Sequence, residues 1–169
     1  PNAMTLSTVN TDLTPRSRVV LLKKFSPNGF VFFSNYDSSK GKSILSNSNV
    51  CLNFYWPSLE KQIIIKGNAK KISEKESDDY FYSRPYGSQI GAIVSNQSEI
   101  IESRELLEKK FNQVNNKYSK TKPKRPENWG GYLVKPNLFE FWQGRKNRLH
   151  DRLEFIQNGS VWNSYRLSP

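Results

Sequence analysis

Two runs of strand-forming residues, VCLNFYW (50–56) and KQIIIKGNAKKIS (61–73), stand on either side of the turn residues Pro57-Ser58. Both runs are rich in β-branched and aromatic side chains, which fit the pleated surface of a sheet. The short polar connection between them is typical of a hairpin. We therefore expect residues 50–73 to form two paired, antiparallel strands.

Further strand-like runs lie before and after this hairpin. Residues 4–10 alternate in polarity, and residues 17–35 predict a first hairpin because SPNG (26–29) has turn chemistry. Towards the carboxyl end, Asn158-Gly159 predicts a tight turn. The strands expected there cover 129–136, 138–144, 148–157 and 160–167. So many strands at this spacing predict a barrel or a closed sandwich.

Helical patterns occupy the middle of the chain. Ser73 and Glu76 form an S-x-x-E capping box, the signature of a helix start. Residues 102–120 predict the longest helix, in which an apolar stripe faces the core. The stripe consists of Leu107, Phe111, Val114 and Tyr118. Shorter helices are expected over 38–48 and 87–95.

The length and composition favour one globular domain. The chain has 169 residues, of which 36% are hydrophobic and 24% charged, and we expect a single domain over residues 1–169 with a helical insertion at about 73–120. The fold class is mostly β with helices (α+β). No apolar run is long enough to span a membrane. The single cysteine, Cys51, favours a reducing, cytoplasmic location. The first methionine is residue 4, so we expect the native chain to begin upstream.

The net charge is +11 and the isoelectric point is near 9.8. Such a surplus attracts polyanions at long range, but a solvated basic surface has the same composition. The placement of the charges has to decide between these interpretations.

The densest basic cluster is EFWQGRKNRLHDR (140–152). If RLHDR is a strand, Arg148, His150 and Arg152 share one face, because side chains alternate along a strand. No acidic residue of that segment compensates their charge on this face, so we interpret it as an anion site. The alternative is an exposed strand edge whose charges discourage aggregation.

Two weaker basic clusters lie in the first quarter of the chain. Arg18 and Lys23 lie five residues apart in SRVVLLKK, which by itself suggests solvated charges at a strand end. Lys40 and Lys42 flank Gly41 near an expected helix start, where backbone N–H groups favour phosphate. An ordinary loop would explain the same Gly/Ser/Lys stretch.

A fourth cluster is YFYSRPYGSQ (80–89), in which Tyr80, Arg84 and Ser88 recur every four residues. If the helix continued past Pro85, a phenol, a guanidinium and a hydroxyl would line one face, and all three donate to phosphate. A helix end with an aromatic residue packed on the core is the alternative.

The sequence lacks the usual catalytic sets. One histidine and one cysteine do not supply a zinc site, so no metal is expected. Neither a nucleophile elbow, a P-loop nor a G-x-G-x-x-G motif is present. Chemistry at these clusters therefore requires a cofactor held by phosphate donors and aromatic surfaces.

The motifs together resemble the pyridoxamine 5′-phosphate oxidase family, in the family's order and over nearly the whole chain. They are PNAM, RVVLLK, FFSN, SSKGK, KQIIIKG, YFYSRPYGSQIGAIVSNQS, WGGY, FEFWQGRKNRLHDRL and the terminal RLSP. The resemblance implies an antiparallel, Greek-key split β-barrel. It also implies a homodimer that binds FMN between its subunits, with no nucleic-acid partner.

The resemblance further implies the site residues. FMN would be bound by Arg18, Val19, Val20, Leu21, Leu22, Lys23, Phe33, Ser34, Ser39, Lys40, Gln62, Gln97, Ser98, Trp142 and Arg152. The substrate would be bound by Lys23, Tyr80, Arg84, Ser88, Arg148, Leu149 and His150, with Arg148 and His150 at the reacting ring.

The implied reaction oxidises pyridoxamine 5′-phosphate or pyridoxine 5′-phosphate to pyridoxal 5′-phosphate. A hydride passes from substrate C4′ to flavin N5, and O2 is reduced to H2O2; the amine substrate also releases ammonia. Two departures from the family are visible. Ser39 stands where the family usually has arginine, which predicts weaker FMN retention, and the family's segment upstream of PNAM is absent.

Two other functions are compatible with parts of the sequence. A flavin-binding barrel without this activity would share the FMN contacts but would not need Tyr80, Arg84, Ser88, Arg148 and His150 together. A basic barrel that binds single-stranded nucleic acid through stacked aromatic residues would explain the isoelectric point. It would not explain the clustering into two phosphate-sized sites.

Overall fold

The computed structural model describes residues 2–169; Pro1, the first residue of the PNAM motif, lies outside the described part. The chain divides into two compact units. The first, called here the sheet unit, comprises the residues up to Phe32, Ser43–Lys70 and Leu133–Pro169. The second, the helical unit, comprises Phe33–Lys42 and Lys71–Tyr132.

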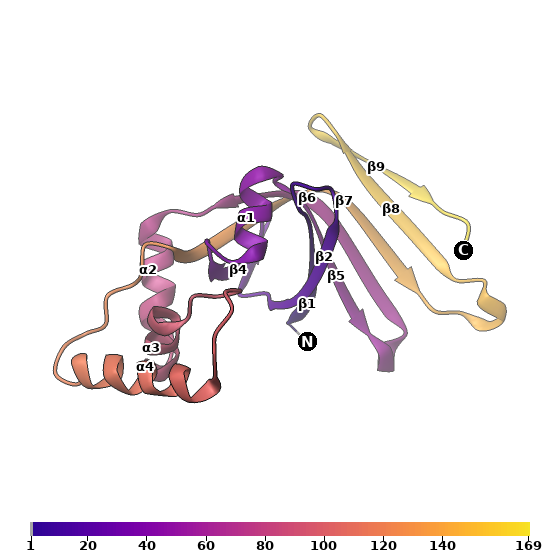
Figure 1. Cartoon of the computed structure of the whole chain (residues 1–169). Coiled ribbons are helices and arrows are strands. Elements are labelled where there is room, and N and C mark those ends of the chain that lie inside the picture. Colours follow the sequence, from indigo (N-terminus) through magenta and orange to yellow (C-terminus); the bar gives the residue numbers. More distant parts are fainter. Residues whose placement is uncertain (1) are drawn as a thin grey trace. The chain divides into compact units, whose positions relative to one another are not determined.

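The sheet has the strand order β2-β1-β5-β6-β7-β4-β3, with β8 paired to β7 and β9 paired to β8 (Figure 1). Its strands are β1 (Ala3–Val9), β2 (Pro15–Leu21), β3 (Lys24–Ser26), β4 (Gly29–Asn35), β5 (Asn49–Trp56), β6 (Lys61–Lys71), β7 (Trp129–Gln143), β8 (Asp151–Asn158) and β9 (Val161–Arg166). The pairs β1–β2, β1–β5, β3–β4, β5–β6, β7–β8 and β8–β9 are all antiparallel.

The central hairpin is confirmed. Strands β5 and β6 pair from Asn49↔Asn68 to Trp56↔Lys61, and the short helix η1 (Pro57–Leu59) joins them. Glu60 follows in a left-handed conformation with φ 48, which turns the chain into β6. Gln62 thus lies at the start of β6, beside this turn.

The first hairpin is only partly confirmed. Ser26 pairs with Gly29 across the expected turn, but this hairpin contains only β3 and β4. The preceding strand β2 pairs instead with β1, from Ala3↔Leu21 to Val9↔Pro15. Strands β1 and β2 are joined by the short turn 10–14, in which the Asn10 N–H donates to the Thr14 carbonyl oxygen at 3.0 Å, so they form a hairpin of their own. Strand β2 therefore follows the sheet's edge, with none of its residues buried.

The core of the sheet unit follows the alternation of the strands. Leu52 and Phe54 on β5 and Ile65 on β6 are 5% exposed or less, as are Met4 and Leu6 on β1. Inward and outward side chains alternate along each of these strands. This packing fixes the register that carries Arg18 and Gln62.

The carboxyl-terminal strands differ from expectation at two places. One strand, β7, covers the two runs expected at 129–136 and 138–144. Strand β8 begins at Asp151 because Lys146–Arg148 form a short 3-10 turn, η2, with φ 60 at both Asn147 and Arg148. The single strand face expected for Arg148, His150 and Arg152 is therefore wrong. The β8–β9 hairpin across Asn158-Gly159 is confirmed, with Gly159 at φ +62.

The helices lie where the patterns predict them. They are α1 (Ser39–Ser46), α2 (Glu74–Ser83), α3 (Tyr86–Val94) and α4 (Arg104–Lys117). Both bonds of the Ser73–Glu76 capping box are present at the start of α2. Phe111 and Val114 on α4 and Tyr118 at its C-cap are half-buried. Leu107 is 38% exposed, and Leu106 is half-buried in its place. In the described part of the chain, no helix combines the length and apolar content that a membrane crossing would need.

Candidate functional site

A buried lysine forms the polar centre of the helical unit. The Nζ of Lys40 donates to Gln97 Oε1 at 2.9 Å, to Ser34 Oγ at 3.0 Å and to Ser38 Oγ at 3.1 Å. Ser34 also donates to Gln97 Oε1 at 3.1 Å. Lys40 is 7% exposed and Ser34 6%. Three residues that the resemblance assigns to FMN thus meet in one network.

The local chain path explains this placement. Ser34 lies near the end of β4, and Lys40 lies in the first turn of α1. The tight bend between them depends on Gly41, since a Cβ there would lie 2.0 Å from the carbonyl oxygen of Tyr36. Ser39 is half-buried beside Lys40, whereas Ser98, next to Gln97, is exposed and has φ 78. Of the described contacts, none connects Ser98 with Lys40.

An aromatic stack carries the second cluster of the helical unit. Phe33 stacks on Tyr80 with ring centroids 3.8 Å apart, and on Trp129 at 5.6 Å. The Arg84 guanidinium lies 4.5 Å from the centroid of the Trp129 ring, a cation–π contact. Sequence reasoning missed Trp129; the WGGY motif that contains it was the available signal.

The helical face expected for Tyr80, Arg84 and Ser88 is not formed. Helix α2 ends at Ser83, and Arg84 is extended with ψ 152 because Pro85 disfavours a helical residue before it. Ser88 is exposed in the first turn of α3. Burial lowers the pKa of Arg84, and its buried Nη1 has no hydrogen-bond partner. Tyr80 and Arg84 gather around Trp129 instead.

Arg18 is a half-buried cation of the sheet unit. Its Nη1 donates to Thr8 Oγ1 at 2.8 Å and to the Leu6 carbonyl oxygen at 3.2 Å, while Nη2 is buried with no hydrogen-bond partner. Burial lowers the pKa of this guanidinium. The expectation of a purely solvated charge is therefore wrong for Arg18.

The other assigned residues of the 18–23 stretch are more open. Val19 and Leu21 are 67% and 46% exposed, and Val20 and Leu22 are half-buried. Lys23 is exposed beyond the end of β2, and its backbone N–H donates to the Val31 carbonyl oxygen at 2.9 Å.

Arg152 has an acidic partner. Its Nε donates to Glu140 Oε1 at 2.7 Å, from β8 to the neighbouring strand β7. Glu140 is 9% exposed, and the bond raises the pKa of Arg152. The idea that this segment lacks acidic compensation is therefore wrong, because the partners come from outside the strand face considered.

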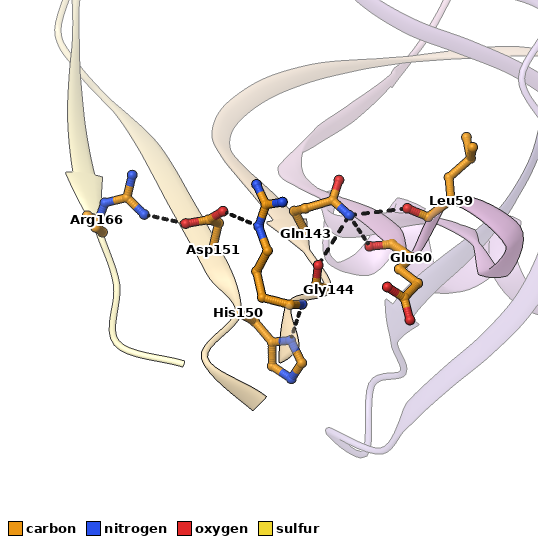
Figure 2. A network of polar contacts seen from close by, with 8 residues as sticks. Leu59, Glu60, Gln143, Gly144, His150, Asp151 and Arg166 are labelled. Atoms are coloured by element: carbon orange, nitrogen blue, oxygen red, sulfur yellow. Dashed lines mark hydrogen bonds and ion pairs between the residues drawn. The ribbon is translucent and has the colours of Figure 1, made fainter. Parts of the chain in front are cut away.

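The connection from β7 to β8 carries Arg148, Leu149 and His150. The Arg145 backbone N–H donates to His150 Nδ1 at 3.1 Å, and the Trp142 ring lies 4.8 Å from the His150 ring. Arg148 and Leu149 are exposed. Figure 2 shows His150 within a network that includes Gln143 and Asp151.

Two hollows adjoin this connection. The larger, of about 470 Å³, is lined in part by Gln62 and Trp142, which the resemblance assigns to FMN. The other, of about 430 Å³, is lined in part by Leu149 and His150, which it assigns to the substrate. The sheet unit thus brings both kinds of assigned residue to the ends of β6, β7 and β8.

The donors present fit a phosphorylated cofactor. Buried N–H groups without partners on Arg18 suit an anion, because such groups are costly to leave unpaired. A buried ammonium held by neutral oxygens, as at Lys40, suits the same chemistry. Each unit also has an aromatic residue among those that the resemblance assigns to FMN, Phe33 in the helical unit and Trp142 in the sheet unit.

The fold is shared with solved structures. PhzG from Burkholderia lata 383, solved with tetrahydrophenazine-1-carboxylic acid, has a TM-score of 0.94 and 28% identity, over 100% of this chain and 83% of that one. A pyridoxamine 5′-phosphate oxidase-related, FMN-binding protein from Nostoc punctiforme has a TM-score of 0.78 at 15% identity, over 99% of this chain and 87% of that one. The class is therefore the mostly antiparallel split β-barrel with helices, and the expected fold is confirmed.

Sequence comparisons identify the family within this class. Residues 1–118 match the family model described as pyridoxamine 5′-phosphate oxidase, and residues 129–169 match the pyridoxine 5′-phosphate oxidase C-terminal dimerisation region. Relatives named pyridoxine/pyridoxamine 5′-phosphate oxidase are 54% identical in Christiangramia forsetii and 56% in Flavobacterium johnsoniae, each over 99% of this chain and 78% of the relative. The chain belongs to the pyridoxamine 5′-phosphate oxidase family of oxidoreductases.

Proposed function

We propose that the protein is an FMN-dependent oxidase that converts pyridoxine 5′-phosphate and pyridoxamine 5′-phosphate to pyridoxal 5′-phosphate. The relatives that carry the corresponding name match nearly the whole chain at more than half identity. The observation that best supports the proposal is the network of Lys40, Ser34 and Gln97, because it joins three separate motifs of the sequence around one buried ammonium group, to which a phosphate would bind.

Each unit contains residues that the family resemblance assigns to FMN. In the helical unit these are Phe33, Ser34, Ser39, Lys40, Gln97 and Ser98. In the sheet unit they are Arg18–Lys23, Gln62, Trp142 and Arg152. Lys40 and Arg18 would donate charge-assisted bonds to phosphate oxygens, which are about twice as strong as bonds between neutral groups. Burial of the Lys40 side chain and of the Arg18 Nη2 atom would strengthen these bonds further.

The substrate phosphate would be bound by Lys23, Tyr80, Arg84 and Ser88. The buried, unpartnered Nη1 of Arg84 supports this assignment, since a phosphate oxygen would satisfy it. Arg148 and His150, with Leu149 between them, would contact the pyridine ring. A phosphate monoester carries close to two negative charges near neutral pH, which explains the number of donors.

When bound, FMN would accept a hydride at N5 from substrate C4′ and pass the electrons to O2, giving H2O2. The chain's own residues would orient the reacting carbon and stabilise charge that develops on the ring. The Arg148 guanidinium would supply a fixed positive charge at the ring, and His150 would donate or accept a hydrogen bond there.

A homodimer would be the working form. The match to a dimerisation region covers β7, β8 and β9, and this part exposes apolar side chains, including Ile156 at 37% and Val161 at 59%. We propose that FMN lies at the subunit interface.

An anaerobic titration tests the function directly. Purified protein saturated with FMN should show the yellow flavin absorption, and pyridoxamine 5′-phosphate or pyridoxine 5′-phosphate added without oxygen should bleach it. Admission of air should restore the band and release H2O2. A flavin band that both substrates leave unchanged would contradict the proposed activity. A protein that takes up no FMN and binds oligonucleotides in a salt-sensitive way would favour the nucleic-acid alternative.

A further inference from the structure

The connection between β7 and β8 is held at its first residues. Gln143 Nε2 donates to the carbonyl oxygens of Leu59 and Glu60 at 3.2 Å each, as Figure 2 shows. The Gly144 N–H donates to the Glu60 carbonyl oxygen at 2.8 Å. A Cβ on Gly144 would lie 2.8 Å from that of Glu60, so only glycine permits this approach. The β5–β6 turn therefore anchors the start of the connection.

A carboxylate holds the other end of the connection. Asp151 accepts a hydrogen bond from Arg145 Nε through Oδ2 at 2.7 Å, and one from Arg166 Nη1 through Oδ1, also at 2.7 Å. It is the first residue of β8, and Gln143 is its cross-strand partner. Asp151 thus ties the connection to the last residue of β9 (Figure 2).

Arg145 links this carboxylate to the histidine. Its side chain bonds Asp151, and its backbone N–H donates to His150 Nδ1. A neutral imidazole has one donor and one acceptor nitrogen, so an accepting Nδ1 leaves the proton on Nε2. The Trp142 ring, at 4.8 Å from the His150 ring and inclined by 43°, restricts the ring's rotation.

We propose that Asp151 is a positioning residue that, by holding Arg145, keeps His150 in the tautomer protonated at Nε2. The role of this tautomer in substrate binding rests on the proposed function: Nε2–H would be a fixed hydrogen-bond donor towards a substrate oxygen. Without the carboxylate, the Arg145 side chain loses its acceptor on β8, and the backbone N–H is no longer held against Nδ1.

The position of the carboxylate supports this role. Asp151 and Arg166 line both hollows, the one with Gln62 and Trp142 and the one with Leu149 and His150. Two charge-assisted bonds hold the pKa of Asp151 below its usual range, and the bond from Arg145 has the larger effect, followed by that from Arg166. The carboxylate therefore stays charged near neutral pH. The same two arginines are the cations that face it.

The tautomer can be measured without turnover because His150 is the only histidine of the chain. The FMN-saturated full chain, without a polyhistidine tag, is labelled with 15N-histidine and studied by NMR at least two pH units above the usual imidazole pKa of about 6.5. We expect one species, protonated at Nε2 and bare at Nδ1. The Asp151→Asn variant should give a mixture of tautomers. An unchanged single species in this variant would overturn the proposal.

Kinetics supply the second test. Asp151→Asn should lower kcat about 10-fold to 100-fold, in line with the cost of misplacing a positioned group, with FMN affinity changed less than twofold. Asp151→Glu should recover part of the loss. Arg145→Gln should match Asp151→Asn, and the double variant should be no worse than either, since both act through one network.

A matched control and a second variant keep the test decisive. Glu108 accepts a bond from Arg104 Nε at 2.8 Å on α4, so Glu108→Gln removes a comparable exposed ion pair and should leave kcat and the tautomer unchanged. If Asp151→Asn does not fold, Arg145→Gln tests the same tautomer. An inactive wild type would contradict the proposed function alone, because the NMR result decides the tautomer independently. An active wild type whose folded variants keep both kcat and tautomer would overturn the positioning role.

Discussion

At the scale of single residues, one half-buried and one buried cation carry the proposed cofactor binding. Arg18 has a buried nitrogen without a partner, and Lys40 is 7% exposed among hydroxyl and amide oxygens. Both arrangements destabilise the protein when no anion is bound, and a bound phosphate would stabilise both. FMN binding should therefore depend more on these two residues than on exposed lysines.

Arg18→Gln should weaken FMN binding about tenfold or more, because a bond to a charged group contributes about 1.5–3 kcal/mol. The measurement is the dissociation constant of FMN from flavin fluorescence. Lys24→Gln, which removes an exposed charge from β3, is the control and should change it little. Equal FMN affinity in wild type and Arg18→Gln would contradict the assignment of Arg18.

Lys40→Gln should also release FMN, and strongly, because Ser39 offers no second cation where the family usually has arginine. The matched control is Lys42→Gln, an exposed lysine on the same helix. In the opposite direction, Ser39→Arg should tighten FMN binding. The argument from charge would be refuted if Lys42→Gln lost FMN while Lys40→Gln kept it.

Asp151 makes stability depend on acid pH. Its folded pKa lies below that of the unfolded chain because Arg145 and Arg166 donate to it. The stabilisation is therefore complete above the unfolded value of about 3.9 and is lost as the pH falls through the lower folded pKa. Urea unfolding of wild type and Asp151→Asn should differ by a constant amount at neutral pH and converge in strong acid. A difference that grows on acidification would have the wrong sign.

The residue types predicted which positively charged side chains belong to the site, but not which acidic side chains pair with them. Sequence reasoning located Arg18, Lys40, Arg84 and Arg152 in clusters, and each of these four is buried or half-buried. It missed Glu140 as the partner of Arg152, because that contact crosses from β8 to β7. Which residues far apart in the sequence become partners depends on how the strands are aligned, and residue composition does not specify this alignment.

At the scale of elements, motifs that consist of a few neighbouring residues predicted the local structure correctly. The capping box, the Asn158-Gly159 turn and the β5–β6 hairpin each follow from a few neighbouring residues, and the structure contains all three. The pairing of β2 with β1 was missed because two adjacent runs joined by a turn usually pair with each other. Strands β1 and β2 are also neighbours along the chain, and the turn over residues 10–14 pairs them.

Ser73→Ala should lower the free energy of unfolding by about 1 kcal/mol, the usual cost of removing a helix cap. Its Oγ accepts from the Glu76 N–H at 3.2 Å, and the Ser73 N–H donates to the Glu76 carboxylate at 3.3 Å. Chemical denaturation measures the change, with Ser160→Ala in the exposed β8–β9 turn as control. Equal losses in the two variants would show that the cap contributes nothing specific.

At the scale of the whole molecule, assembly and activity should be linked. The part of the chain that matches a dimerisation region exposes several apolar side chains, including Ile156 and Val161. An interface between copies would remove this surface from water. The prediction of a homodimer rested on the family resemblance. No strand pattern in the sequence predicts it, because the pattern of one chain does not indicate what covers an exposed apolar surface.

Ile156→Asp should shift the protein towards monomer and weaken FMN retention, because a charge on this surface would have to be buried. Sedimentation velocity measures the first effect, and flavin released on dilution measures the second. Ile100→Asp, at a fully exposed position of the helical unit, is the control. A dimer that is unaffected by Ile156→Asp would place the interface elsewhere.

The paired left-handed residues Asn147 and Arg148, both at φ 60, have an evolutionary consequence. Asparagine tolerates this conformation better than most residues, whereas arginine adopts it at a conformational cost. Glycine at 148 would remove the cost together with the guanidinium. Among related sequences, position 147 should therefore vary between Asn, Asp and Gly, whereas position 148 should accept almost no substitution of arginine. Sequence change in this bend should be confined to its first residue.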